Sequence, residues 1–310
     1  MKKFIVPIIC LITIIVFAFY NNKLVTYATN FFTNKQDLVL LAGNEYTKTN
    51  DYLYVQRSSS YVPLGYQDVL NIFYSIINNH WETFTFYCPS EYEECINDVT
   101  KLSESSDVLS NINNFVHPYN SFTNVKTSID SNGEIIVKVS YLYTDDQINF
   151  INKEVDRIIS ENYDSSRAMD ENIKAIHDYI INNTKYDIEY ENNKDKLTYT
   201  AYGVLMHHLA TCNGYTDLMA IILSKLNINN YKIAFNPDPE ENSEGHVWNA
   251  VNINGKWLHL DLTWDDPVGD GRDYLYHKYF LVTTDEMKEA DNGDVQVKEH
   301  NFDRYIYQEY

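Results

Sequence analysis

The sequence predicts a mixed α+β fold, because segments with helical and with strand periodicity alternate along the chain. Residues 145–161 and 170–183 carry apolar side chains at the three- and four-residue spacing of an amphipathic helix. Residues 134–143 alternate apolar and polar side chains, as a half-buried strand does. Two turn signals, at residues 131–133 and at Asn254-Gly255, each separate a pair of expected strands.

The amino terminus has the pattern of an export signal. Met1-Lys2-Lys3 is basic, and an apolar run follows from Phe4 to Tyr20. We therefore expect residues 1–22 to be a signal peptide or a membrane anchor. The basic end stays in the cytoplasm. The rest of the chain is then exported, either anchored with its domains outside the membrane or secreted after cleavage.

A chain of 310 residues accommodates one or two domains. Composition and residue pattern divide the 288 residues after the amino-terminal segment into three parts. Residues 23–60 are polar and are expected to form a linker. Residues 61–162 predict a small amino-terminal α+β module without a catalytic motif. Residues 163–310 hold the candidate site described below.

The net charge narrows the class of partner. The chain has 24 basic and 44 acidic residues, which gives a formal net charge of −20. Nucleic-acid binding needs a basic face, so we do not expect a nucleic-acid partner.

A predicted hairpin brings a histidine close to an aspartate. Asn254-Gly255 is typical of a two-residue type I′ turn, here between expected strands at residues 247–253 and 256–263. In that register His246 is the diagonal neighbour of Asp261 on one face, at roughly 7–8 Å between Cα atoms. Trp248 shares this face, so we expect it to border the site. Trp264 falls on the opposite, apolar face and is expected in the core.

A cysteine is expected at the start of a helix. Cys212 precedes apolar residues at helical spacing: Leu218, Ile221, Ile222 and Leu226. The positive end of a helix favours thiolate over thiol, and its backbone N–H groups can form an oxyanion hole. The alternative is a buried structural cysteine, although the neighbours Thr211, Asn213 and Gly214 argue against an apolar pocket.

Two further cysteines, Cys88 and Cys95, leave two alternatives open. Outside the cytoplasm they are able to close a short disulfide loop, and otherwise they are two unpaired thiols. A zinc site needs a second pair of ligands at metal spacing, which the sequence does not offer. We expect no metal and no other cofactor.

Several segments, taken in order, resemble the transglutaminase-like superfamily in its bacterial exported branch, over about residues 165–285. These are Ile176-His177-Asp178-Tyr179, Ala201-Tyr202-Gly203-Val204-Leu205, Thr211-Cys212-Asn213-Gly214-Tyr215, His246-Val247-Trp248-Asn249, Gly255-Lys256-Trp257, Asp261-Leu262-Thr263-Trp264-Asp265-Asp266-Pro267 and Tyr279-Phe280-Leu281. The resemblance implies a papain-like α+β core, in which a helix bearing the cysteine packs on an antiparallel sheet bearing the histidine and the aspartate.

The resemblance also implies roles for individual residues. Cys212 corresponds to the nucleophile, His246 to the general base and acid, and Asp261 to the residue that orients the imidazole. Tyr202 corresponds to a position beside the nucleophile that lines the oxyanion site. Asn213 departs from the acidic or small residues that are frequent in relatives, which leaves the chemistry intact but alters the local field.

The expected activity is acyl transfer from a carboxamide of a protein or peptide through a thioester. Resolution by an amine gives an isopeptide crosslink, and resolution by water gives deamidation or peptide cleavage. Export makes surface or cell-wall proteins and peptides the expected substrates. A cysteine peptidase and a non-catalytic module that binds surface proteins are the alternatives.

Overall fold

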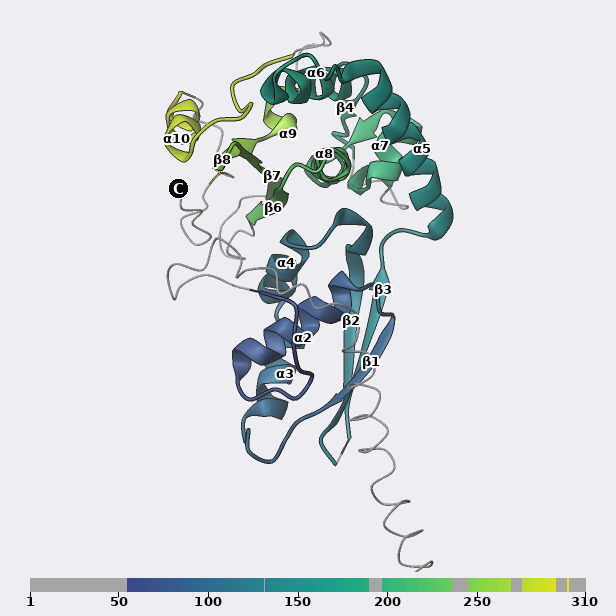
Figure 1. Cartoon of the computed structure of the whole chain (residues 1–310), viewed down its shortest axis with the longest axis vertical. Helices are drawn as coiled ribbons and strands as arrows, with labels where there is room; N and C mark the ends of the chain where they lie inside the picture. Colours follow the sequence, from purple (N-terminus) through teal and green to yellow (C-terminus); the bar gives the residue numbers. More distant parts are fainter. Residues whose placement is uncertain are drawn as a thin grey trace, which may run out of the picture.

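The computed structural model describes residues 55–130, 132–189, 197–235, 245–268, 275–293 and 300. Helices and antiparallel strands form two lobes, the lower and the upper lobe in Figure 1, each around its own apolar core. This mixed architecture confirms the predicted α+β class.

The lower lobe is a three-stranded antiparallel sheet in the order β1-β3-β2, with helices covering one face (Figure 1). Gly133, with a φ of +77°, lies in the turn between β2 and β3, where the sequence predicts a hairpin. The elements are α2 (Tyr66–Asn78), β1 (Thr83–Tyr87), α3 (Cys95–Glu104), α4 (Ser106–Asn114), the 3₁₀ turn η1 (Pro118–Asn120), β2 (Phe122–Ile129) and β3 (Glu134–Tyr141).

The lower lobe begins earlier than the sequence predicts. Val55 is buried in the lower core, and the backbone N–H of Ser58 donates to Oγ of Ser75 in α2, at 2.6 Å. Residues 55–60 are therefore part of this lobe, and the predicted linker boundary at residue 60 is wrong. The expected signal or anchor at 1–22 and the linker up to residue 54 lie outside the described residues. Within the described part of the chain, no helix is both long and apolar enough to cross a bilayer.

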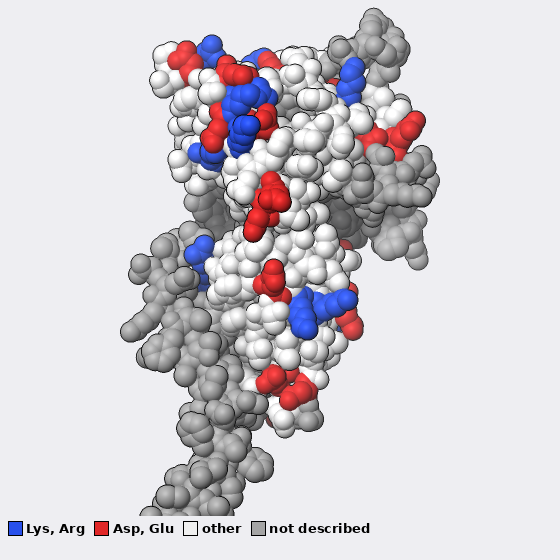
Figure 2. Space-filling model, turned by 90° about the vertical axis from the view of Figure 1, so that its right-hand side faces the viewer, with Lys and Arg blue, Asp and Glu red and all other residues white. Residues whose placement is uncertain are grey.

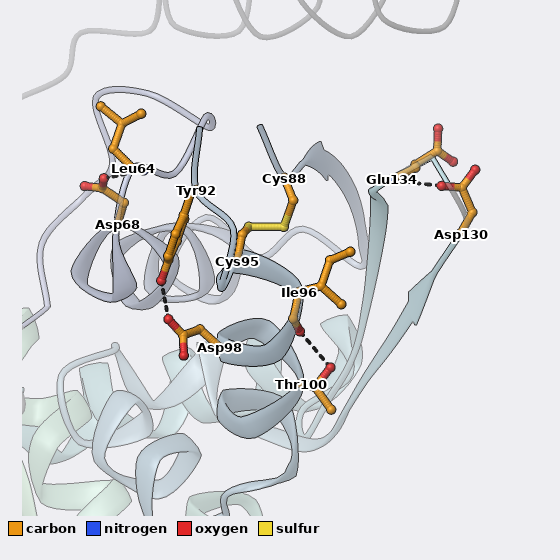
Figure 3. The surroundings of a disulfide bond; sticks show 10 residues. All are labelled: Leu64, Asp68, Cys88, Tyr92, Cys95, Ile96, Asp98, Thr100, Asp130 and Glu134. Atoms are coloured by element: carbon orange, nitrogen blue, oxygen red, sulfur yellow. Dashed lines mark hydrogen bonds between the residues drawn. A yellow bond between two sulfur atoms is a disulfide. The ribbon is translucent and has the colours of Figure 1, made fainter. Parts of the chain in front are cut away.

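A disulfide between Cys88 and Cys95 joins the end of β1 to the first residue of α3 (Figure 3). The structure thus settles the alternative that the sequence left open for these two cysteines. The hydroxyl of Tyr92, within the closed loop, donates to the carboxylate of Asp98 in α3. The loop is therefore attached to the helix by a covalent bond and by a hydrogen bond.

The upper lobe has helices on one side and the antiparallel sheet β6-β7-β8 on the other, with α8 between them (Figure 1). The predicted helices at 145–161 and 170–183 correspond to α5 and α6. The sequence placed α5 in the amino-terminal module at 61–162, but its apolar side chains pack in the core of the upper lobe. The elements are α5 (Asp145–Asn162), α6 (Met169–Asn182), β4 (Lys185–Tyr186), η3 (Leu197–Tyr199), α7 (Ala201–His207), β5 (Leu209–Ala210), α8 (Cys212–Lys225), β6 (Asn230–Phe235), β7 (His246–Ile253), β8 (Lys256–Leu260), α9 (Leu262–Asp265) and α10 (Thr284–Asn292).

A buried polar network joins the two lobes. The ammonium of Lys232 in β6 lies 3.0 Å from Oδ1 of Asp217 in α8 and 3.1 Å from Oγ of Ser121, which immediately precedes β2. The hydroxyl of Tyr143 donates to the other oxygen of Asp217, at 2.8 Å. A buried charge is tolerated where it is paired and hydrogen-bonded, so this network holds the lower lobe against α8.

Close approach of the chain to the start of α8 requires glycine at position 214. A Cβ atom there would lie 2.5 Å from the carbonyl oxygen of Thr198 in η3 and 2.8 Å from a methyl group of Val204 in α7. Both distances are shorter than van der Waals contact, so any side chain would push α8 away from its neighbours.

The acidic character of the chain is visible on the face in Figure 2. Acidic side chains occur on both lobes, and several of the basic side chains of this face lie close to acidic ones. On α5, Arg157 pairs with Glu154 and Glu161. The described basic side chains on this face do not form a continuous stretch.

We predict that replacing both Cys88 and Cys95 by serine lowers the free energy of unfolding by about 2–3 kcal/mol, because the bridge closes a short loop in the unfolded chain. Urea unfolding of the oxidised protein measures the change, and reduction of the wild type serves as the matched control. An unchanged urea midpoint, or free thiols at both positions before reduction, would contradict the structure.

We predict that Gly214→Ala destabilises the protein by about 1–3 kcal/mol, because the added methyl group overpacks the junction of α8 with η3. The matched control is Gly293→Ala, where the nearest heavy atom to an added Cβ is 3.4 Å away. Thermal or urea unfolding compares the two variants. Equal stability of both variants would show that α8 is not held as closely as described.

Candidate active site

Cys212 is the first residue of α8, as the sequence predicts. The preceding residue, Thr211, is the N-cap, and its backbone N–H donates to the carbonyl of Thr198 at 2.9 Å. N–H groups in the first turn of a helix have no acceptor within the helix. The thiol therefore lies beside backbone donors, and it is 9% exposed.

Two hydrogen bonds dock α8 on β7 close to this thiol. The hydroxyl of Thr216, one turn after Cys212, donates to the carbonyl of Val247 at 2.9 Å. The side-chain amide of Asn249 donates to the carbonyl of Thr216 at 3.1 Å. Val247 follows His246 directly, so this docking brings the imidazole close enough to Cys212 for the cysteine to act on the pKa of His246.

The predicted hairpin register is confirmed. Ile253 pairs with Lys256 and Val251 pairs with Leu258. Asn254 and Gly255 both have positive φ, at 54° and 84°, as a type I′ turn requires.

The second strand of the hairpin is shorter than predicted. β8 ends at Leu260 instead of Thr263, because the Asp261 side chain caps the short helix α9. Its Oδ1 accepts from the backbone N–H groups of Thr263, at 2.9 Å, and Trp264, at 3.3 Å. Aspartate is among the preferred N-cap residues, and here the cap overrides the continuation of the strand.

The expected imidazole–carboxylate contact is present despite the shorter strand. Nε2 of His246 lies 2.6 Å from Oδ2 of Asp261, and both side chains are buried. Since Nε2 faces Asp261, Nδ1 is the ring nitrogen that remains for the thiol. Cys212 on α8, His246 on β7 and Asp261 at the start of α9 therefore lie together, with His246 hydrogen-bonded to Asp261.

The charges around His246 favour a protonated imidazole. Burial by itself lowers the pKa of His246, but the Asp261 carboxylate and the Cys212 thiol together raise it well above its ordinary value. For the Asp261 carboxyl, burial has the opposite effect and raises the pKa. The two neighbouring imidazoles, His246 and His300, outweigh burial and hold this pKa well below its usual range. Both shifts favour an ion pair of an anionic Asp261 with a protonated His246.

Trp248 lies beside the imidazole of His246, and a role for it in lining a substrate groove stays a prediction. Its side chain is completely buried, and its ring stacks on His246 with centroids 5.7 Å apart. Its indole N–H donates to Nδ1 of His259 at 3.1 Å. Burial, with the nearby His300, lowers the pKa of His259 to about 3, which leaves that nitrogen free to accept. Trp248 therefore packs against one face of the His246 imidazole.

Trp264 was expected on the apolar face and in the core. It does pack against a buried cluster, but the predicted face is wrong. The turn at Asp261 that starts α9 redirects the chain, and Trp264 packs with the aromatic cluster around Trp248 instead. The apolar face of the hairpin packs with α8 through Val251 and Leu260, and Leu262 of α9 joins the same core.

Tyr202 is the second residue of α7, and α7 packs beside α8. Its ring meets Phe150 of α5 edge-on, with centroids 5.3 Å apart. A role for Tyr202 at an oxyanion site stays a prediction. Asn213 is exposed next to the nucleophile, with its side-chain nitrogen 4.0 Å from Sγ of Cys212.

Sequence reasoning missed His300. Its Nε2 lies 2.8 Å from Oδ2 of Asp261, the same oxygen that His246 contacts. The residue lies beyond the segments that carry the family resemblance, in an acidic stretch without hydrophobic periodicity. A histidine 39 residues after Asp261 gives no local signal of this contact.

Among the described residues, two groups of three side chains have the composition of a metal site: His177, Asp178 and His277, and His246, Asp261 and His300. In both groups the imidazoles contact the carboxylate directly, at 2.6–2.9 Å. Hydrogen bonds between imidazole and carboxylate account for both groups.

The first of these groups has a structural role. Nε2 of the buried His177 in α6 lies 3.2 Å from Oδ2 of Asp265 in α9, whose other oxygen accepts from the backbone N–H of Tyr279 at 3.0 Å. These contacts fasten α9, and with it the Asp261 cap, to α6.

Comparison with known proteins adds to this geometry. Kyphoscoliosis peptidase from Homo sapiens and its counterpart from Mus musculus are each 23% identical over 141 residues, 42% of this chain. That match spans 21% of the length of either relative. A solved structure described as the crystal structure of a TGase is 14% identical, with 49% of this chain and 46% of that chain covered and a TM-score of 0.35.

A model of the transglutaminase-like superfamily matches residues 155–262. The match begins within α5, and it includes Cys212, His246 and Asp261. The chain therefore contains a transglutaminase-like domain over these residues.

Proposed function

We propose that this protein catalyses thiol-dependent acyl transfer on carboxamides of proteins or peptides. The observation that carries the proposal is the buried His246–Asp261 hydrogen bond beside the Cys212 thiol at the start of α8. The match to a superfamily of cysteine enzymes supports the same chemistry.

Cys212, His246 and Asp261 each have a defined part in the proposed reaction. Sγ of Cys212, as the thiolate, attacks the carboxamide carbon, and the C–N bond breaks as His246 gives its proton to the leaving ammonia or amine. An incoming amine or water then loses a proton to His246 and attacks the thioester, which releases the thiolate. Asp261 keeps the imidazole oriented throughout, and N–H groups at the start of α8 stabilise the oxyanion.

The incoming nucleophile decides between two products. The low exposure of Cys212 supports transfer to an amine, because a site that excludes water protects the thioester from hydrolysis. Hydrolysis, and so a cysteine peptidase, is the second candidate, since the similar human and mouse proteins are named peptidases.

We further propose that the protein acts outside the cytoplasm, on surface or cell-wall proteins and peptides. The Cys88–Cys95 disulfide supports this location, because disulfides persist in oxidising compartments. The basic and apolar amino-terminal sequence supports export and contact with a membrane. The net charge of −20 supports a partner other than nucleic acid.

We predict that the full chain incorporates a fluorescent primary amine into casein, and that Cys212→Ala abolishes the incorporation. Gel fluorescence measures transfer, released ammonia measures deamidation, and new casein fragments measure peptidase activity. Cys212-dependent fragments without amine incorporation would favour the peptidase. Absence of all three products would contradict an enzymatic function and favour a binding module.

We predict that His246→Ala loses turnover while the thermal unfolding curve keeps its cooperative shape, because proton transfer to and from the reacting groups is lost. The matched control is His207→Ala, an exposed histidine at the end of α7. If His246→Ala turns over substrate as fast as this control does, His246 has no part in the mechanism.

We predict that Asp261→Asn lowers kcat by about 10²–10⁴-fold, by analogy with the loss of the orienting acid in other triads. The amide no longer offers His246 an anionic acceptor, so the imidazolium is less stable and its orientation is less defined. Steady-state kinetics on the amine-incorporation assay measures the loss. A kcat close to that of the wild type would reduce Asp261 to a helix cap.

A further inference from the structure

The Asp261 carboxylate receives more donors than a catalytic triad supplies. Oδ1 accepts two backbone N–H groups from the first turn of α9, and Oδ2 lies 2.6 Å from Nε2 of His246 and 2.8 Å from Nε2 of His300. The side chain is 1% exposed. Two imidazoles therefore share one carboxylate oxygen in a site from which water is almost excluded.

His300 is itself held between two carboxylates. Its Nδ1 lies 2.8 Å from Oδ1 of Asp291, near the end of α10, while its Nε2 faces Asp261. An ionised carboxylate is only an acceptor, so each ring nitrogen must donate and the ring is an imidazolium. Burial lowers the pKa of His300, but the hydrogen bonds to both aspartates raise it above the ordinary value.

Packing fixes the orientation of this second imidazole. The His300 ring meets Trp248 edge-on with centroids 5.1 Å apart and lies 5.0 Å from the ring of Tyr279. Trp264 and His246 complete the surroundings, at 6.3 and 5.5 Å. The ring is buried, so it has little room to turn away from Asp261.

We propose that His300 is a positioning residue of the acyl-transfer site, which holds the Asp261 carboxylate in place and makes His246 a better proton donor. This inference rests on the proposed function. Asp261 would otherwise form an ion pair with His246 alone, which favours keeping the proton on His246. The positive charge of His300 opposes protonation of His246, because two like charges close together each disfavour the charged form of the other.

The charges that bear on His300 come from four elements. Asp261 precedes α9 and Asp291 belongs to α10, and both stabilise the imidazolium. His246 on β7 carries a positive charge and opposes it, whereas His259 on β8 is neutral because of its low pKa. Removal of the His300 charge should therefore raise the pKa of His246 and move the basic limb of the pH–rate profile to higher pH.

The test compares His300→Phe and His300→Gln with the control His207→Gln, all in the full chain and in the amine-incorporation assay. We expect His300→Phe to lower kcat by about 10- to 100-fold, the range seen for outer partners of metal-bound histidines, with little change in KM. Its basic limb should move to higher pH. His300→Gln keeps one N–H donor without the charge, so it should recover part of kcat while the shifted limb remains.

A second variant keeps the proposal testable if His300→Phe fails to fold. Asp291→Asn removes the outer carboxylate, so less of the His300 imidazolium forms and the basic limb should move in the same direction by a smaller amount. His300 variants with the kcat and pH profile of the control, or a limb that moves to lower pH in Asp291→Asn, would reduce His300 to a packing residue.

Failure of this inference is distinguishable from failure of the proposed function. If the wild type turns over no substrate, the acyl-transfer proposal fails. The positioning claim is then measured by the rate at which iodoacetamide alkylates Cys212 at pH 7, read from the peptide that carries Cys212. Equal alkylation rates in the wild type and His300→Gln would overturn the positioning claim. A rate that changes in His300→Gln but not in the control His207→Gln would support it.

Discussion

Burial of the Asp261 carboxylate imposes the arrangement of the site, because a charge that is 1% exposed must be balanced by donors from several elements. The first turn of α9 supplies two of them, β7 supplies His246, and the chain after α10 supplies His300. The same carboxylate ends β8 and starts a helix. One side chain thus determines the local backbone, the orientation of an imidazole and the electrostatics of the thiol beyond it.

The rest of the molecule brings the thiol to this carboxylate. Gly214 lets α8 approach η3, and Thr216 binds α8 to β7 one turn after the nucleophile. The lower lobe contributes to the same helix through Ser121 and the buried pair of Lys232 with Asp217. Its role therefore includes support of α8, although the sequence gives it no catalytic motif.

Much of this was predictable from local pattern, and the rest was not, for physical reasons. The register that places His246 near Asp261 follows from the alternation of apolar residues and the Asn254-Gly255 turn, both of which are local. β8 ends early because the Asp261 side chain caps α9 instead of continuing the strand. The alternation of apolar and polar residues carries no information about this competition. His300 depends on a contact across 39 residues in an acidic stretch, and no periodicity marks it.

The most direct test of the account is the rate of iodoacetamide alkylation at Cys212 at pH 7, followed in the full chain through the peptide that carries it. Because the thiolate is the reactive form of cysteine, a thiol paired with the His246 imidazole predicts faster alkylation in the wild type than in His246→Ala. The control His207→Ala should react at the wild-type rate. Equal rates in all three proteins would contradict the pairing on which the proposed chemistry depends.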